Sequence, residues 1–330
     1  MTASRITRRQ FSNGLAAAAV AAGLVPGSAR AQSYPSRPVR FVLPFAAAGV
    51  ADITSRLAAE KLGEKLGQRF VVENQPGPGG IAAARAVLSQ APDGYTIGLV
   101  TNGTSISVAL YKALPFDPVK DFACISTIGA FDLVVATNAE SELKTLSDFI
   151  KGAREQPGKL NVGTITVGGT QNLAAELLKS SAGLNFQIIP YRGTPDVIVA
   201  LLRNDVQLMI DFYAPMKSTL LDQKIRAVAT SGPSRSPFFT DVPTVAEAGV
   251  TGYEVTSWNG LFAPVGTPPE VISLLNKTIR EIVATPDVKQ RYADLGIEAK
   301  ASTPEELKAR LTGDIAKWAA VIERANIPRQ

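Results

Sequence analysis

The sequence predicts an α/β protein with two lobes, and three observations support this. Short apolar runs typical of strands alternate with longer segments of helical periodicity along the first half of the chain. The second half repeats this alternation, and the end of the chain has only helical patterns. Small or glycine-rich loops connect several strands to the helices that follow them. Such alternation is typical of parallel sheets with crossover helices, so we expect two α/β lobes that face a cleft.

Each element follows from its own pattern of apolar residues. The strands are expected at residues 39–45, 70–74, 95–101, 133–137, 160–165, 186–190, 206–211, 226–230 and 261–264. The helices are expected at residues 52–66, 81–91, 146–156, 170–182, 196–204, 269–284 and 304–325. The last helix begins with Thr303 and Pro304, a capping residue followed by a proline, which is a common helix start.

The first 31 residues predict an export signal. They contain four arginines and no acidic residue, then the apolar run Gly14 to Val25, then Ala29-Arg30-Ala31. A basic start, a short apolar run and a small-x-small site are typical of a signal peptide, cleaved here after Ala31. The run Thr7-Arg8-Arg9-Gln10-Phe11 resembles a twin-arginine signal, and an ordinary secretory signal is the alternative. We therefore expect a periplasmic protein.

Charge and residue usage exclude several classes of function. The chain has a net charge of +5, and most of this excess lies in the leader, with no dense Lys/Arg run elsewhere to bind nucleic acid. It has no histidine, which excludes His-based triads and the common zinc sites. The single cysteine, Cys124, lies in an apolar run and is expected to be buried and unreactive. We therefore expect neither a metal nor a cofactor.

Three loops of the first half end a strand and begin a helix, where parallel sheets bind ligands. The loop Pro44 to Asp52 presents small residues and backbone N–H groups that favour an anion. Asp52 itself is either a ligand contact or a structural acid of the helix start. The loop Asn74 to Gly80 is either a cradle for a phosphate or carboxylate or a plain glycine turn. The segment Thr101 to Ser105 suits a polar ligand or caps a helix.

The second half repeats the arrangement. The loop Thr164 to Asn172 follows a strand, and Thr170 is expected to cap a helix that begins near Gln171. Tyr191 and Asp211 lie at two further strand ends. Asp211 either recognises the far end of a ligand or caps the following turn. No loop pairs a nucleophile with a base, so the sequence does not predict an enzyme.

Several short runs, in this order and spacing, resemble the Bug family of periplasmic solute-binding proteins, the receptors of tripartite tricarboxylate transporters. The matching runs are Tyr34 to Arg40, Pro44-Phe45 with Gly49 and Asp52, Glu73 to Gly80, Ala91 to Thr96, Pro190 to Gly193, Asp241 to Gly249, and Leu261 to Pro264 with Thr267-Pro268. The resemblance covers essentially the whole mature chain.

The resemblance implies a type II periplasmic-binding-protein fold, with two α/β lobes around a ligand cleft. Residues 34–135 and 256–330 are then the first lobe, and residues 136–255 the second. A ligand carboxylate is held largely by backbone groups and ordered water of the first lobe. Carried over by position, the first wall is Phe45, Ala47, Gly49, Gly80, Thr101 and Asn102, with Asp52 nearby, and the facing wall is Thr166, Gly168, Thr170, Tyr191 and Asp211.

Two positions depart from the family pattern. Ala48 replaces the first glycine of the first loop, and Asn172 stands where the family usually has a histidine.

The expected function is capture of a small carboxylate by a monomeric receptor and its delivery to membrane transporter subunits. A ligand-presenting partner of a membrane sensor is an alternative, and a His-independent periplasmic hydrolase is a more distant one.

Overall fold

The computed structural model describes residues 34–47, 49–165 and 167–330. The fold below is that of the second of the two units into which the chain divides, Arg37–Gln330. The predicted signal peptide with its cleavage site after Ala31, and the loop residues Ala48 and Thr166, lie outside the described residues. Within the described part of the chain, no helix has the length and apolar character needed to cross a membrane.

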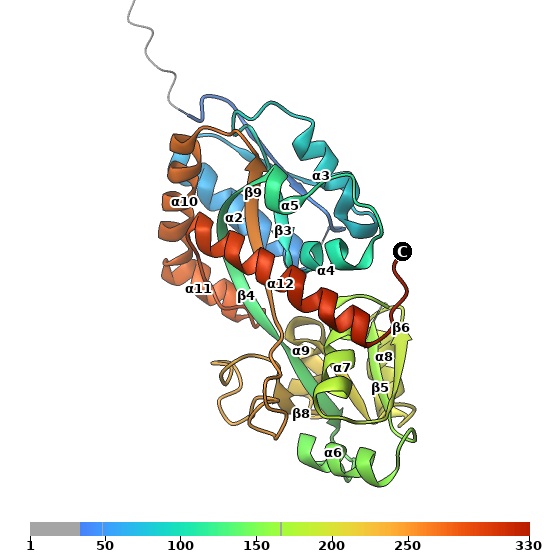
Figure 1. The fold of residues 1–330 in the computed structure, drawn as a ribbon. Coiled ribbons are helices and arrows are strands. Elements are labelled where there is room, and N and C mark those ends of the chain that lie inside the picture. The colour runs from blue at the N-terminus through green and yellow to red at the C-terminus, as the bar shows by residue number, and fades with distance from the viewer. Residues whose placement is uncertain (1–33, 48, 166) are drawn as a thin grey trace, which may run out of the picture. The chain divides into compact units, whose positions relative to one another are not determined.

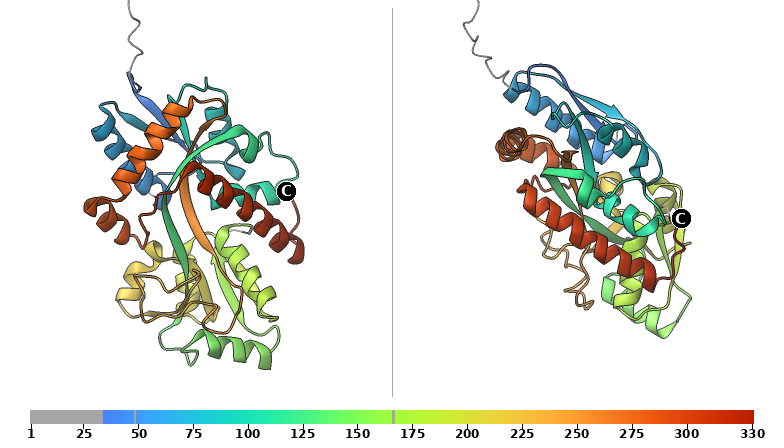
Figure 2. Two further views of the ribbon diagram at one scale, coloured as in Figure 1. Left: turned by 60° about the vertical axis from the view of Figure 1, so that its left-hand side comes forward. Right: turned by 45° about the horizontal axis from the view of Figure 1, so that its top comes forward.

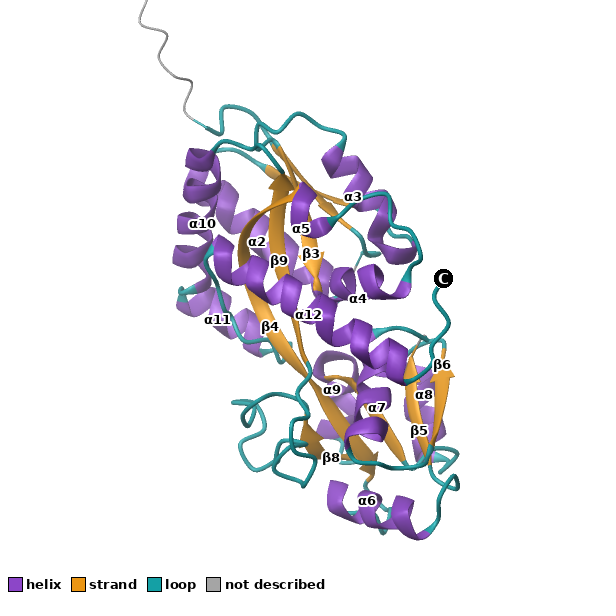
Figure 3. Ribbon diagram, viewed as in Figure 1, coloured by secondary structure: helices purple, strands orange, loops and turns teal. Residues whose placement is uncertain are grey.

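Nine strands and a larger number of helices alternate through the described part of the second unit (Figure 3). The strands are β1 (Val39–Leu43), β2 (Phe70–Asn74), β3 (Thr96–Thr101), β4 (Phe122–Asn138), β5 (Asn161–Ile165), β6 (Gln187–Tyr191), β7 (Leu208–Phe212), β8 (Ile225–Thr230) and β9 (Thr256–Pro264). The helices are α2 (Val50–Leu66), the short 3₁₀ helix η1 (Pro78–Gly80), α3 (Ile81–Leu88), α4 (Asn102–Leu110), α5 (Pro118–Asp121), α6 (Leu146–Glu155), α7 (Thr170–Ser181), α8 (Thr194–Leu202), α9 (Tyr213–Leu221), α10 (Pro269–Val283), α11 (Pro286–Ala293) and α12 (Pro304–Arg324).

The strands form two sheets that share β4. In the first sheet β2, β1 and β3 are parallel, and β9 lies antiparallel between β3 and the first part of β4. In the second sheet β6, β5 and β7 are parallel, and the last part of β4 lies antiparallel to both β7 and β8. The predicted α/β class is thus confirmed, with crossover helices connecting the parallel strands (Figure 1).

The strand β4 connects the two sheets. It has 17 residues, whereas a typical strand has about five or six. From Phe122 to Asp132 it pairs with β9, and from Leu133 onward it pairs with β7 and β8. The chain returns at Thr256, which starts β9 opposite Asp132. The main chain therefore passes between the sheets at two neighbouring places.

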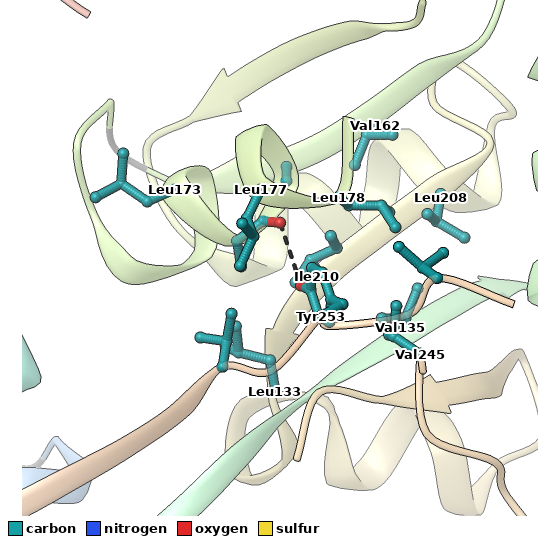
Figure 4. Packing of buried hydrophobic residues seen from close by; sticks show 14 of the residues in the cluster. Leu133, Val135, Val162, Leu173, Leu177, Leu178, Leu208, Ile210, Val245 and Tyr253 are labelled. Carbon is teal, nitrogen blue, oxygen red and sulfur yellow. Dashed lines mark hydrogen bonds between the residues drawn. The ribbon is translucent and has the colours of Figure 1, made fainter. Parts of the chain in front are cut away.

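The core of the second sheet is apolar on the face covered by α7. Leu133 and Val135 of β4 and Ile210 of β7 are fully buried there. The buried Tyr253 lies among them and donates its hydroxyl to the backbone oxygen of Ala174, 3.1 Å away (Figure 4). This bond satisfies the one polar atom of a large side chain that is otherwise in an apolar environment.

Helix α12 packs against parts of both halves. Leu307 and Leu311, near its start, belong to the apolar cluster of the first sheet. Trp318 and Ile322, near its end, belong to the cluster of the second sheet. In Figure 2 the helix runs from beside β4 toward α7. The two sheets are thus connected by α12 as well as by β4.

The predicted strands and helices are confirmed in position, with some corrections. The sequence predicts only residues 133–137 of β4 and 261–264 of β9 as strands, and it does not predict α4, α5, α9 or α11 as helices. The helix expected to begin near Gln171 with Thr170 as its cap begins at Thr170, and Gly169 is the capping residue. Cys124 is buried, as predicted.

Candidate functional site

A cavity of about 810 Å³ opens where the carboxyl ends of strands from both sheets meet. Thr101 ends β3, Ile165 ends β5 and Phe212 ends β7, and all three line it. This is the position at which α/β sheets bind ligands. Its volume lies in the upper part of the range of about 300–1,000 Å³ that is usual for small-molecule sites.

The start of α2 forms one part of the first wall. Gly49 is the N-cap residue of α2 and offers no side-chain oxygen to the first turn. Gly49, Val50 and Ala51 line the cavity together with Phe45 of the preceding loop. The N-terminus of a 17-residue helix carries a partial positive charge and presents backbone N–H groups, and this favours a bound anion.

Asp52 is turned away from the cavity and is structural. Its side chain is 4% exposed. One carboxylate oxygen accepts from Arg56 Nε at 2.9 Å, and the other accepts from Asn74 Nδ2 at 2.9 Å. Asn74 Nδ2 also donates to the backbone oxygen of Phe45 at 3.0 Å. Asp52 therefore fixes the first-wall loop and does not line the cavity.

The start of α4 forms the middle of the first wall. Thr101 caps the helix by accepting from Gly103 N at 3.1 Å, and its own N–H donates to Thr104 Oγ1 at 3.2 Å. Thr101, Gly103 and Thr104 line the cavity, and Gly80 of η1 lies in the same wall. The sequence leaves open whether this segment caps a helix or faces a ligand site. Thr101 both caps α4 and lines the cavity.

Asn102 does not line the cavity, in contrast to the expectation. Its side chain is 1% exposed. Its amide oxygen accepts from Trp318 Nε1 at 2.7 Å, and its amide nitrogen donates to Thr170 Oγ1 at 3.1 Å. The side chain of Asn102 therefore connects α12, α4 and α7, and both of its polar atoms have hydrogen-bond partners within the protein.

The start of α7 forms one part of the facing wall. Gly168, Gly169, Thr170 and Gln171 line the cavity there. Gly168 has a φ of +77°, and a Cβ at this position would lie 2.7 Å from Leu110 Cδ2. Its N–H donates to Asn172 Oδ1 at 3.0 Å. Only glycine combines this backbone conformation with so close an approach to α4.

Asp211 lies in the facing wall. One carboxylate oxygen accepts from Gln171 Nε2 at 2.9 Å and from Phe212 N at 2.8 Å, and the other accepts from Thr194 Oγ1 at 2.6 Å. Burial raises the pKa of Asp211, and the hydrogen bonds from Gln171 and Thr194 lower it in part. Asp211 thereby ties the start of α7 to the starts of α8 and α9.

The remaining predicted residues lie elsewhere. Ala47 is exposed and does not line the cavity, and Tyr191 packs against the apolar cluster around Val197 and Leu201. Among the predicted residues that the structure describes, those that line the cavity are Phe45, Gly49, Gly80, Thr101, Gly168, Thr170 and Asp211.

Several lining residues were not predicted as site residues. They include Phe131, Phe212, Gln171, Thr194, Ser257 and Asn259. Gln171 and Phe212 adjoin the predicted residues Thr170 and Asp211 in the sequence, and Thr194 lies three positions after the predicted Tyr191. Phe131, Ser257 and Asn259 come from the middle of β4 and from β9, and nothing in their local sequence signals a site.

The cavity has no cationic side chain among the described residues that line it, and Asp211 is the only acidic one within the wall. Across the described part of the chain, no group of three acidic or cysteine side chains is placed to hold a metal ion. The polar groups that the described lining offers besides Asp211 are therefore backbone N–H groups at helix starts and hydroxyl and amide side chains.

The sequence and the fold are similar to those of known receptors. Residues 54–327 match the model of the tripartite tricarboxylate transporter family receptor. The chain is 31% identical to protein BugT of Bordetella pertussis, over 88% of this chain and 90% of that protein. Two solved structures from Rhodopseudomonas palustris, each 31% identical, are similar in fold. They are Rpa4515 with adipate (TM-score 0.76; 89% of this chain and 99% of that chain) and MatC with bound malate (TM-score 0.73; 88% and 100%).

Proposed function

Because the chain belongs to the family of tripartite tricarboxylate transporter receptors, which are periplasmic solute-binding proteins, we propose that it captures a small carboxylate and delivers it to membrane transporter subunits. One observation carries the proposal. The starts of α2, α4, α7 and α8 all contribute to one cavity, which no described lysine or arginine lines. Converging helix N-termini bind an anion without a side-chain cation.

The carboxylate binds at the first wall, between the starts of α2 and α4. Gly49, Val50 and Thr101 bring backbone groups to the cavity there, and α2 has no side-chain cap that competes for its first N–H groups. The relatives solved with adipate and with malate support a carboxylate ligand. The donors are fixed by secondary structure before the ligand arrives, which reduces the free-energy cost of organising the site.

The ligand binds between two lobes that move relative to each other. We assign residues 34–135 and 256–330 to the first lobe and residues 136–255 to the second. The pairing of β4 changes partner after Asp132, close to the first of these boundaries, and β9 begins at Thr256, at the second. A ligand that contacts both walls stabilises the closed arrangement to the extent that these contacts are absent in the open one. The proposed role includes no chemical reaction on the ligand, in keeping with a family of receptors.

Calorimetry on the purified protein tests the proposal. Mono- and dicarboxylates are titrated alongside two other probes, a neutral sugar of comparable size and a divalent metal ion. We expect a carboxylate to bind and the sugar and metal to give no heat. Gly49→Pro removes one backbone donor near the start of α2 and should weaken carboxylate binding, whereas Gly313→Ala, in an open position on α12, should leave it unchanged. Tight binding of the sugar or the metal instead would refute the proposal.

Export is tested separately. We propose that the leader is removed after Ala31 and that the mature protein begins at Gln32. Mass spectrometry of periplasmic material measures the mass of the mature chain directly. Recovery of the protein only with membranes, with the leader still attached, would contradict periplasmic delivery.

A further inference from the structure

Two phenylalanines face the cavity at the place where the two sheets meet. Phe131 is on β4 opposite Ser257 of β9, and Phe212 ends β7 opposite Leu133 of β4. Their ring centroids are 5.0 Å apart, and the rings are inclined by 70°, an edge-to-face arrangement. Both side chains are only half-buried and both line the cavity. The pair therefore presents aromatic surface to whatever occupies the cavity.

Two further lining residues, one from each wall, add apolar surface to the cavity. Phe45, in the loop before α2, is 39% exposed, and Val167, in the loop before α7, is 53% exposed. Both line the cavity. Large apolar side chains that are left in contact with water around a concave site are typical of a surface that a ligand covers.

The charges in the cavity leave room for one carboxylate. In the facing wall, Asp211 already accepts hydrogen bonds from the starts of α7, α8 and α9, through Gln171, Thr194 and Phe212 N. The carboxylate of Asp211 therefore already lies at the helix N-termini that would otherwise favour a ligand carboxylate in that wall. A second ligand carboxylate placed there would face Asp211, with no described cation in the lining to offset the repulsion.

We propose that the ligand is an aromatic monocarboxylate, with its carboxylate at the starts of α2 and α4 and its ring against Phe131 and Phe212. This inference rests on the proposed function, since it assigns a class of ligand to the same cavity. A third ring extends the edge-to-face pair, because aromatic rings prefer edge-to-face or offset contacts at centroid distances of about 4.5–7 Å. The volume of about 810 Å³ accommodates a ring as well as a carboxylate.

Calorimetry with matched probes tests the inference. The probes are benzoate and 3-phenylpropionate, the aliphatic monocarboxylate hexanoate, and the dicarboxylates succinate and adipate. We expect an aromatic probe to bind at least about tenfold more tightly than either dicarboxylate. Phe131→Leu and Phe212→Leu keep an apolar side chain but remove the ring. Each should weaken 3-phenylpropionate about tenfold and hexanoate by no more than about threefold.

Phe239→Leu is the matched control. Phe239 pairs edge-to-face with Tyr213 at 5.2 Å and does not line the cavity, so its loss should leave all affinities unchanged. Thermal melting establishes that each variant is folded. Tightest binding of succinate or adipate, or equal loss of hexanoate and 3-phenylpropionate in the two variants, would overturn the aromatic inference and leave the proposed function intact. Failure of every carboxylate to bind would overturn both.

Discussion

Asn102 donates its side-chain amide to Thr170 Oγ1 at 3.1 Å, and so connects the first turn of α4 with the first turn of α7. The same amide accepts from Trp318 Nε1 of α12 at 2.7 Å. One buried side chain thus joins a helix of the first sheet, a helix of the second sheet and the helix that packs against both. These contacts lie beside the cavity, since Thr170 lines it.

We expect Asn102→Ala to lower the free energy of unfolding by about 1–3 kcal/mol, because the buried Trp318 N–H loses its acceptor. Thr170→Val removes only an acceptor of the Asn102 amide and should cost less. Asn185→Ala, at an exposed position, is the control and should change stability by no more than about 0.5 kcal/mol. Urea unfolding measures all three. A loss for Asn102→Ala as small as that of the control would show that Trp318 needs no partner at this position.

Local sequence patterns predicted most elements but not those that depend on distant partners. The strand over residues 70–74 was predicted with the bounds that the structure has, because its apolar residues and flanking turns are local. In contrast, β4 is long because β9 pairs with its first part and β7 and β8 with its last. Helix α4 begins with Asn102-Gly103-Thr104-Ser105, residues of low helix propensity, and its start depends on the Thr101 cap.

The same distinction applies to the site. Strand-to-helix loops pointed to Phe45, Gly49, Thr101, Gly168 and Asp211, and these five residues line one cavity. Asn102 lies in such a loop, but its partner is Trp318, more than 200 positions away in the chain. Phe131 and Phe212 come together only through antiparallel pairing of β4 and β7. Tertiary pairing of this kind has no local signal.

Asp211→Asn tests whether Asp211 positions the facing wall or contacts the ligand. An asparagine offers one oxygen in place of two, so one of the three donors that Asp211 now satisfies loses its acceptor. We expect a loss of about 1–3 kcal/mol in stability and weaker binding of monocarboxylates, measured by calorimetry. Loss confined to ligands with an amino or hydroxyl group at the far end would indicate direct contact instead. Asp196→Asn, an exposed acid in the first turn of α8, is the control.

Asp132 should make the stability of the protein depend on pH. Its carboxylate lies where β4 leaves the first sheet and accepts from Thr256 Oγ1 at 2.9 Å. Burial raises its pKa from 3.8 to about 6, with contributions from Glu254 and Glu298 that raise it and from Arg310 that lowers it. Between pH 3.8 and about pH 6 the folded state binds a proton that the unfolded state has released, so the free energy of unfolding falls as pH rises. Once the pH is above the folded-state pKa of about 6, this loss of stability is complete.

We therefore expect Asp132→Asn to stabilise the protein above pH 6 by about 1–3 kcal/mol. Asparagine keeps an oxygen for Thr256 but has no charge to desolvate. The variant should also lack the fall in stability between about pH 4 and pH 6. Urea unfolding over this range measures both effects, with the exposed Asp241→Asn as the control. An unchanged pH profile in the Asp132 variant would mean that the carboxylate is well solvated.

Gly168→Ala should reduce both stability and carboxylate binding. The substitution places a side chain at a φ of +77° and a methyl group 2.7 Å from Leu110 Cδ2, so either the loop before α7 or the Leu110 side chain must shift. The backbone conformation alone costs about 1–2 kcal/mol. Gly183→Ala isolates that cost, because Gly183 has a φ of +59° with nothing within 4 Å of the added carbon.

The difference between these two variants thus measures the contact with Leu110. The double variant Gly168→Ala/Leu110→Ala removes the collision and keeps the backbone strain. We expect it to recover carboxylate binding relative to Gly168→Ala, although truncation of the buried Leu110 adds its own loss of stability. Calorimetry and urea unfolding separate the two quantities. If Gly168→Ala and Gly183→Ala lose equal stability and neither loses binding, then close packing of this loop on α4 does not shape the cavity.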